Sequence, residues 1–332
     1  MTRARRPTVA ILGTGGTIAG SRSSTDGIHY QPATLGIDEL IATVPGLDAL
    51  ADLRSEQIFQ VDSINMDDAA MLALARRTAE TLADDDIDAA VVTHGTDTLE
   101  ESSYLLHLTL KTHKPVVFVA SMRPGDGLGA DGPRNLRSAV AVAASEQSIG
   151  MGVLAVMNDE IHTARDASKT HTLNVSALRS PHGPLGYVLG QWPLFYRAPI
   201  RPHTERTAFH LDAIAELPQV DVIYGHSGMS TTVIDALIGS STSAIIYAGM
   251  GNGNMSDVVQ KGLQAARASG IHVARASRAG HGPVLRNAAV HDDDNDWIAV
   301  DDQTPQKARL LMALGLTTTQ DAKDLQQLFW TY

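Results

Sequence analysis

The sequence predicts an α/β fold of two domains, a larger N-terminal parallel-sheet domain and a smaller C-terminal α/β domain. Short aliphatic and β-branched runs alternate with longer segments of helical periodicity, which is typical of parallel sheets with right-handed crossovers. A stretch dense in proline and aromatic residues interrupts this alternation at 181–202. At 332 residues the chain is long enough to form two separate cores.

Seven apolar runs are predicted to be strands, and each ends in, or is followed by, glycine, asparagine or a hydroxyl residue. They are 9–12, 89–93, 116–120, 152–157, 220–224, 244–248 and 272–276. Helices are predicted between them where apolar residues recur with the helical period. These segments include 67–83, 98–110 and 135–144.

The stretch at 181–202 predicts a hairpin followed by a linker. We therefore expect an N-terminal domain at 7–200 and a C-terminal domain at 219–332, with the linker at about 201–218. The acidic runs 84–86 and 292–294 are expected in loops as solvated turns. Neither run has the ligand spacing of an EF-hand calcium site.

Composition and charge exclude several classes of function. The formal net charge of -11 argues against nucleic acid or an anionic membrane as the main partner. The chain has no cysteine, which excludes disulfides, thiolate catalysis and cysteine-ligated metal. No stretch is long enough to span a membrane. The basic N-terminus precedes an apolar run too short for a signal peptide, so we expect a cytoplasmic protein, or a periplasmic one if a leader was removed before the sequence was recorded.

The segment 8–20, TVAILGTGGTIAG, is the centre of the candidate site. Its apolar part predicts a strand buried on both faces, and its glycines allow a sharp turn that presents Thr14 and Thr17. Parallel strands of α/β proteins carry their chemistry at this end. A dinucleotide fingerprint would need glycine where Ile18 stands, and a P-loop lysine is absent. A structural turn whose threonines cap the next helix remains an equal alternative.

Two further segments add the groups that threonine chemistry needs. VVTHGTDTLEE, 91–101, places Thr96 and Asp97 at a turn before a helix that begins near Leu99; Asp97 could instead be a helix cap. Downstream, Lys169 follows another strand, although a lysine alone is usually a surface residue. A threonine hydroxyl needs a base, and a desolvated lysine of lowered pKa can serve, with Asp97 or a tyrosine relaying the proton. The segment GHSGM, 225–229, lacks the last glycine of a nucleophile elbow and does not favour a serine hydrolase.

Six segments in one order carry a resemblance to a known family. They are TGGTIAG (14–20), VVTHGTDTLEES (91–102), MNDEIHTARDASKTHT (157–172), GPLGYV (183–188), AGMGNGN (248–254) and PQKARLLMALGLT (305–317). Over essentially its whole length the chain resembles the bacterial L-asparaginases of the asparaginase–glutaminase family. The resemblance implies a homotetramer, built as a dimer of intimate dimers, whose active sites lie between the large domain of one subunit and the small domain of its neighbour.

The resemblance also implies the role of each site residue. Thr17 matches the nucleophile, Tyr30 in GIHYQP matches the loop tyrosine that assists it, and Thr96, Asp97 and Lys169 match a second triad. The residues implied in binding L-asparagine are Gly16, Ser63 (α-carboxylate), Ile64, Gly95, Thr96, Asp97 (α-ammonium) and, from the neighbouring subunit, Asn254. The expected course is a β-aspartyl-threonine ester released by water, without metal or cofactor. The glycines at 13–16 and 95 are expected to let backbone N–H groups approach the carbonyl oxygen.

The chain departs from the family pattern at two positions. Ile64 stands where the family often has glutamine, and Ala289 stands where it commonly has glutamate. Both departures bear on affinity and on the preference for asparagine over glutamine. The alternatives are a glutaminase-asparaginase of broader specificity, a weakly active amino-acid-binding homologue, and the amidase subunit of a tRNA-dependent amidotransferase, which would be expected to carry an extra N-terminal domain.

Overall fold

A computed structural model of the chain describes residues 5–22 and 29–332. The predicted fold class is confirmed, with a larger α/β unit followed by a smaller one. The chain divides into Met1–Ala213 and Ile214–Tyr332, and we describe each unit by itself. Gly27 and Ile28 of the GIHYQP motif lie outside the described residues.

The N-terminal unit is built on an eight-stranded sheet of order β12-β11-β8-β7-β6-β5-β1-β4. The strands are β1 (Thr8–Gly15), β4 (Asp52–Val61), β5 (Ala89–Thr93), β6 (Val116–Val119), β7 (Val153–Met157), β8 (Glu160–Thr163), β11 (Gly186–Leu189) and β12 (Trp192–Phe195). All eight residues of β1 are buried, as predicted for a strand covered on both faces. The predicted hairpin is present as the antiparallel pair β11 and β12.

The large sheet is mainly parallel, as predicted, and ends in antiparallel strands that include the predicted hairpin. Strands β4, β1, β5, β6 and β7 run parallel, whereas β8, β11 and β12 pair antiparallel. The chain reverses after β7 because Asn158 and Asp159 both have positive φ, at 51° and 62°. Two such residues close a tight hairpin whose twist matches that of the flanking strands. Asparagine and aspartate tolerate this conformation better than other side chains.

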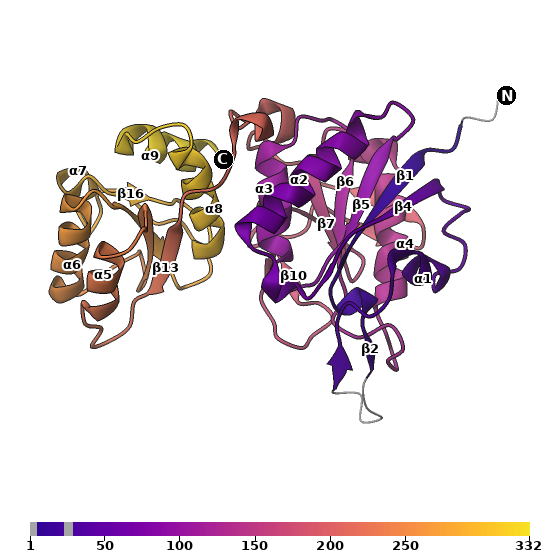
Figure 1. Cartoon of the computed structure of the whole chain (residues 1–332), viewed down its shortest axis with the longest axis horizontal. Coiled ribbons are helices and arrows are strands. Elements are labelled where there is room, and N and C mark those ends of the chain that lie inside the picture. Colours follow the sequence, from indigo (N-terminus) through magenta and orange to yellow (C-terminus); the bar gives the residue numbers. More distant parts are fainter. Residues whose placement is uncertain (1–4, 23–28) are drawn as a thin grey trace. The chain divides into compact units, whose positions relative to one another are not determined.

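Helices cover both faces of the large sheet (Figure 1). They are α1 (Ile37–Ala42), α2 (Asp68–Ala83), α3 (Leu99–Thr109) and α4 (Gly132–Ala143). Helices α1 and α4 pack on the face that carries Val9, Ile11 and Val91, through Leu40 and Leu136. Helices α2 and α3 lie on the opposite face. This three-layer arrangement buries the parallel strands and leaves their carboxyl ends for the turns that form the site.

Several short elements sit outside the main sheet. Two-residue ribbons are formed by β2 (Ser21–Arg22) with β3 (Tyr30–Gln31), and by β9 (Ser168–Lys169) with β10 (Leu178–Arg179). Single turns of 3₁₀ helix are η1 (Thr17–Ala19), η2 (Ser63–Asn65), η3 (Glu146–Ser148), η4 (Thr204–Arg206) and η5 (Leu211–Ala213). Both ribbons and the first two turns carry residues of the candidate site.

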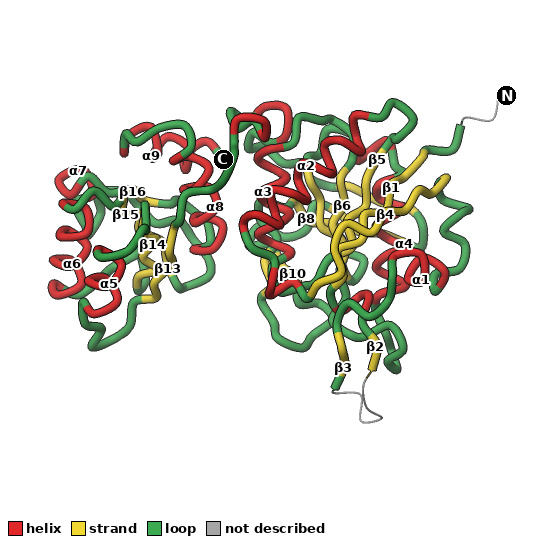
Figure 2. The backbone as a smooth tube through the Cα atoms, viewed as in Figure 1, coloured by secondary structure: helices red, strands yellow, loops and turns green. Residues whose placement is uncertain are grey.

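The C-terminal unit has a parallel sheet of order β13-β14-β15-β16. Its elements are β13 (Val220–Tyr224), α5 (Thr232–Ile238), β14 (Ala244–Gly249), α6 (Asp257–Ala268), β15 (His272–Ser277), α7 (Asp292–Asn295), β16 (Ile298–Ala299), α8 (Pro305–Leu316) and α9 (Ala322–Thr331). Helices α5 and α6 pack on one face through Ile234 and Leu263, and α8 and α9 lie on the other (Figure 2).

The acidic run 292–294 is not a solvated loop, which corrects the expectation for it. These residues begin α7, and Asp292 is fully buried. Its carboxylate accepts hydrogen bonds from Nε and Nη2 of the buried Arg275, at 2.6 and 2.7 Å. A paired guanidinium permits burial of a carboxylate that would otherwise stay in water. The run 84–86 does lie between elements, and Asp84 pairs with Arg54 at the surface.

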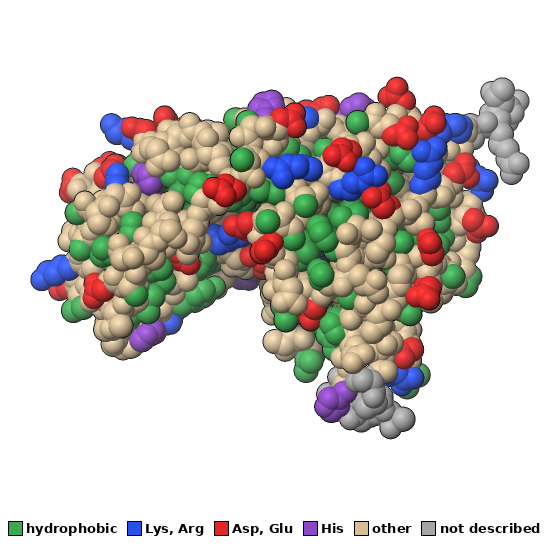
Figure 3. Space-filling model, viewed as in Figure 1, with side chains coloured by type: hydrophobic (Ala, Val, Ile, Leu, Met, Phe, Trp, Pro, Cys, Tyr) green, Lys and Arg blue, Asp and Glu red, His purple; other side chains and the backbone are tan. Residues whose placement is uncertain are grey.

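Among the described residues, no helix is both long enough and apolar enough to cross a membrane. On the face shown in Figure 3, Lys and Arg side chains are interspersed with Asp and Glu over the larger unit. Exposed ion pairs such as Arg5–Asp88 and Arg77–Glu56, both 2.8 Å, contribute to this mixture. Such pairs add little to stability because water competes for each charge.

Candidate active site

The turn after β1 brings Thr17 to the candidate site through two glycines of positive φ. Gly15 and Gly16 have φ of 101° and 78°, which a residue with a Cβ rarely adopts. A Cβ on Gly16 would lie 2.4 Å from the Cα of Gly95, so the turns after β1 and β5 touch through their backbones. Thr17 begins η1 directly after this contact and is buried, whereas Gly16 holds the N-cap position. Thr17 is therefore not a helix cap.

Ser63 joins the same cluster from the end of β4. A Cβ on Gly95 would lie 2.4 Å from Oγ of Ser63, so the absence of a side chain at 95 makes room for this hydroxyl. Ser63 is buried in η2, and its carbonyl accepts a 2.7 Å hydrogen bond from Oγ1 of Thr98. The next side chain, Ile64, is 64% exposed. The turns that follow three neighbouring parallel strands thus meet where α/β folds bind ligands.

The backbone N–H of Gly16 itself is not among the groups that could approach a carbonyl oxygen of a ligand. It donates to the carbonyl of Val61 at 3.0 Å and is therefore engaged within the fold. The requirement for glycine at this position comes from the contact with Gly95, not from a backbone N–H offered to a ligand. The sequence could not reveal this contact, because the two glycines are far apart along the chain.

The hydroxyl of Thr17 has a tyrosine partner. Its Oγ1 lies 3.2 Å from the phenolic oxygen of Tyr30. Tyr30 is on the ribbon of β2 and β3, where it pairs with Arg22, and it is 41% exposed. A phenol at this distance can exchange a proton with the threonine hydroxyl.

Thr96, Asp97 and Lys169 form a second connected group. Nζ of Lys169 donates to Oγ1 of Thr96 at 2.9 Å and forms a close ion pair with Oδ1 of Asp97. The stem of Lys169 lies in an apolar setting lined by Leu99, Met157, Ala177 and Leu178. The N-cap of α3 is Thr98, so Asp97 is not the helix cap that the sequence left open. An amine held between a hydroxyl and a carboxylate can relay a proton from one to the other.

Two polar residues of the same turns have structural roles. Oγ1 of Thr14 donates to the carbonyl of Thr93 at 2.8 Å and ties β1 to β5. His94 is fully buried, and Nδ1 donates to the carbonyl of Gly95 at 2.8 Å. Burial lowers the pKa of His94 to about 4, so the ring is neutral at pH 7. This agrees with the sequence-based interpretation of His94 as a packing and hydrogen-bonding residue.

The remaining two residues of interest lie in the C-terminal unit. Asn254 is exposed in the turn after β14, where its backbone bridges to Met250. Ala289 is exposed in the segment before α7. The structure therefore brings eight residues together within the N-terminal unit and carries Asn254 on the other unit. The eight are Gly16, Thr17, Tyr30, Ser63, Gly95, Thr96, Asp97 and Lys169.

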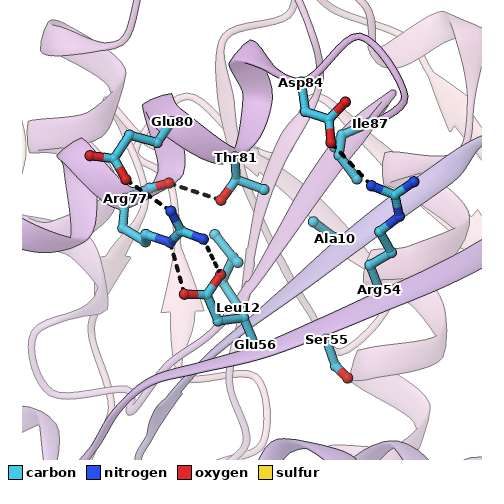
Figure 4. Close-up of a pocket in the computed structure, with 10 residues that line it drawn as sticks. All are labelled: Ala10, Leu12, Arg54, Ser55, Glu56, Arg77, Glu80, Thr81, Asp84 and Ile87. Carbon is cyan, nitrogen blue, oxygen red and sulfur yellow. Dashed lines mark hydrogen bonds and ion pairs between the residues drawn. The ribbon is translucent and has the colours of Figure 1, made fainter.

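A surface cavity of about 290 Å³ elsewhere in the N-terminal unit is a poorer candidate (Figure 4). Its charged groups already pair with one another, since Arg77 binds Glu56 and Glu80 and Arg54 binds Asp84. The remaining lining is mostly aliphatic, and Thr81 donates to a backbone carbonyl of α2.

Throughout residues 5–22 and 29–332, no group of three or more His, Asp or Glu side chains is arranged to hold a metal ion.

Comparison with known proteins identifies the family. The family model described as "Asparaginase, N-terminal" matches residues 8–201, and "Glutaminase/Asparaginase C-terminal domain" matches residues 219–329. The chain belongs to the asparaginase family. The resemblance drawn from the sequence is confirmed, and with it the expectation of an enzyme of the asparaginase class.

Relatives of this asparaginase-family chain match along nearly their whole length. The glutaminase-asparaginase of Pseudomonas fluorescens biotype A is 45% identical, covering 100% of this chain and 92% of the relative. L-asparaginase 2 of Escherichia coli (strain K12) is 40% identical, covering 98% and 93%. The crystal structure of the probable cytoplasmic L-asparaginase from Campylobacter jejuni superposes with a TM-score of 0.95 at 41% identity, covering 98% of this chain and 100% of that one.

Proposed function

We propose that this protein hydrolyses the side-chain amide of L-asparagine to L-aspartate and ammonia, with Thr17 as nucleophile. The observation that carries the proposal is the contact between Gly16 and Gly95, which sets Thr17 beside the Thr96–Asp97–Lys169 group. A threonine alone is a weak nucleophile. This contact brings it close to side chains that can accept and pass on its proton.

In the proposed first step, Oγ1 of Thr17 bonds to the amide carbon as its proton passes to a neighbouring group. Tyr30, 3.2 Å away, accepts that proton while its own phenolic proton passes to the amide nitrogen. The tetrahedral intermediate then collapses, the carbon–nitrogen bond breaks, and the proton leaves with ammonia. The product is a β-aspartyl ester on Thr17.

In the second step, water replaces ammonia at the same carbon. The Thr96 hydroxyl accepts a proton of this water as its own proton passes to Nζ of Lys169, which in turn gives a proton to Asp97. The bond between the acyl carbon and Thr17 breaks, and the proton returns along these groups to Oγ1 of Thr17. Ser63 and Asp97 hold the α-carboxylate and the α-ammonium, so that the same contacts orient substrate and ester.

A glutaminase-asparaginase of broader specificity is the second candidate function. It is favoured by the Pseudomonas fluorescens relative of that name, which is 45% identical over the whole chain. Comparing kcat/KM for L-asparagine and L-glutamine separates the two, because the discrimination between substrates is the ratio of these values.

We further propose that the active enzyme is a homotetramer in which Asn254 of a neighbouring subunit completes each site. The proposal rests on the family and on the exposure of Asn254 in a unit other than that of Thr17. A cytoplasmic location is part of the same proposal, supported by the name of the Campylobacter jejuni protein. Light scattering on the purified protein and fractionation of producing cells test the two statements.

The deciding experiment is Thr17→Ala, assayed by ammonia release from L-asparagine. Loss of the nucleophile is expected to lower kcat by about 10⁴-fold or more, while the unfolding temperature stays near that of the parent. Rapid acid quenching of the parent with substrate, followed by peptide mass spectrometry, should place an aspartyl adduct on the peptide that holds Thr17. Substantial turnover by well-folded Thr17→Ala would refute the assignment.

A further inference from the structure

Lys169 is held by a ribbon that has little backbone support of its own. Strand β9 has only two residues, and it pairs with the two residues of β10, with Lys169 opposite Leu178. One further backbone hydrogen bond, from Thr170 to Ala177 at 2.8 Å, extends the ribbon. The ribbon is a separate sheet from the eight strands that carry Thr17 and Thr96. The place of the Lys169 amine therefore depends on how β10 is fixed to the main sheet.

Side chains of β8 make that connection. Nδ1 of His162 lies 2.9 Å from Oγ of Ser180, the residue that follows β10. On the same strand, Glu160 forms a 3.6 Å ion pair with Arg179 of β10. Strand β8 is itself fixed on both sides by antiparallel pairing with β7 and β11. Two contacts between side chains thus join the ribbon to a rigid part of the unit.

The His162 ring is buried between β8 and β10. It is 1% exposed, and its Nε2 lies 3.2 Å from Oε2 of Glu160, close enough for electrostatic attraction but not aligned as a hydrogen bond. This proximity, with the charge of Arg179, lowers the pKa of Glu160. A carboxylate beside Nε2 favours a proton on that nitrogen, which leaves Nδ1 to accept the hydroxyl of Ser180. The hydrogen bond at Nδ1 therefore connects β8 to the residue that follows β10.

We propose that His162, through Ser180, is a positioning residue for Lys169 in the proposed reaction. Nζ of Lys169 reaches Thr96 and Asp97 only if β9 keeps its position near the turn that follows β5. Displacing a catalytic group by about 1 Å lowers turnover by about 10²-fold. The inference rests on the role proposed for Lys169, so its test includes a measurement that does not need turnover.

The test compares Ser180→Ala with Ser180→Thr, which keeps a hydroxyl, and with Ser176→Ala, which removes a hydroxyl elsewhere in the loop between β9 and β10. Ser180→Ala is expected to lower kcat for L-asparagine about 10-fold or more with little change in KM. Acetylation of Lys169, measured by mass spectrometry against the exposed Lys261 as reference, should speed up several-fold as its ion pair with Asp97 loosens. Ser180→Thr and Ser176→Ala should resemble the parent in both measurements. His162→Gln serves as a second variant and should resemble Ser180→Ala.

The outcomes separate this inference from the proposed function. Unchanged acetylation of Lys169 in both Ser180→Ala and His162→Gln would overturn the positioning role, whatever happens to kcat. Equal losses in Ser176→Ala would also overturn it, because the effect would then belong to the loop as a whole. Faster acetylation in an enzyme whose parent releases no ammonia from asparagine would refute the proposed function and leave the positioning role intact.

Discussion

At the scale of single residues, we expect Ile64 and Ala289 to affect how tightly the proposed substrate is held. The resemblance to the family puts glutamine and glutamate at these positions, whereas this chain carries an exposed isoleucine beside Ser63 and an exposed alanine. The substrate ammonium has three N–H donors, and donors left without acceptors in an enclosed site lose binding free energy. We therefore expect Asp97 to be the main charged partner for the ammonium.

We expect Ala289→Glu, alone or combined with Ile64→Gln, to lower the KM for L-asparagine. A charge-assisted hydrogen bond contributes about 1.5–3 kcal/mol, which corresponds to about 10- to 100-fold in affinity. The unmodified enzyme is correspondingly expected to use L-glutamine poorly. Steady-state kinetics on both substrates measure the effect. An unchanged KM in both variants would mean that the ammonium is recognised by other groups.

The pKa of His94 predicts how stability depends on pH. The folded value of about 4 lies below the ordinary value of 6.5 because burial disfavours the charged ring. Stability is therefore complete above about pH 6.5 and falls as the pH drops toward 4, since the unfolded chain binds the proton first. Between pH 7 and pH 4.5 this residue alone should remove about 2–3 kcal/mol from the free energy of unfolding. Urea unfolding at the two pH values measures this loss. In His94→Gln the difference in the free energy of unfolding between the two pH values should be smaller by about the same 2–3 kcal/mol.

At the scale of elements, the pair of Arg275 on β15 and Asp292 on α7 organises the loops of the C-terminal unit. Arg275 also donates to the carbonyls of Asn252, at 2.9 Å, and Leu285, at 3.0 Å. The backbone N–H of Asn287 donates to Asp292 at 2.8 Å. This buried pair thus connects the turn that carries Asn254 with the segment that carries Ala289.

Asp292→Asn is expected to lower the free energy of unfolding by about 3–5 kcal/mol, because it leaves a buried guanidinium without its counter-charge. The adjacent Asp293→Asn is a matched control. Asp293 pairs with Arg286 at a position where its side chain is 65% exposed, so its loss should change the free energy of unfolding far less than the loss of Asp292 does. Thermal unfolding measures both. Equal effects of the two substitutions would contradict the importance of burial.

The elements divide clearly into those that the sequence predicts and those that it does not. Strands β5 and β13 are predicted at their observed bounds, and β5 shows the clearest signal because its continuous buried run ends in a turn. Strand β4 lies at the sheet edge, and its many exposed polar residues hide it. The ribbon of β9 and β10 is too short to show any periodicity. In both cases the pairing partner, not the local sequence, produces the strand.

The candidate site shows the same division. The residue types at the ends of β1 and β5 indicated threonine chemistry, and the resemblance supplied their roles. The Glu160–His162–Ser180 contacts were not predicted, because they join residues of ordinary composition that become neighbours only in the folded unit. A buried histidine two positions after a glutamate on one strand was the available signal. It identifies a polar network only once the partner from β10 is known.

At the scale of the whole molecule, the proposed assembly predicts complementation between two inactive variants. Thr17→Ala damages the large-unit part of a site, and Asn254→Ala damages the part that a neighbour contributes. In a mixed pair related by two-fold symmetry, one site combines both defects and the other is assembled entirely from undamaged parts. Neither variant can form such a site with copies of itself.

Equal amounts of the two variants, dissociated and reassembled together, should therefore recover about one quarter of the parental ammonia release, because about half of the pairs are mixed and each has one intact site of two. Each variant reassembled alone provides the baseline, and light scattering confirms that the oligomer has re-formed. The recovery also distinguishes shared sites from sites that are complete within one subunit. If each site were complete within one subunit, mixing the two variants would recover no activity. Activity in the mixture equal to the mean of the two baselines would refute shared sites. Thr17→Ala mixed with Thr96→Val is the matched control, because both substitutions lie in the large unit and no exchange of small units can repair either site.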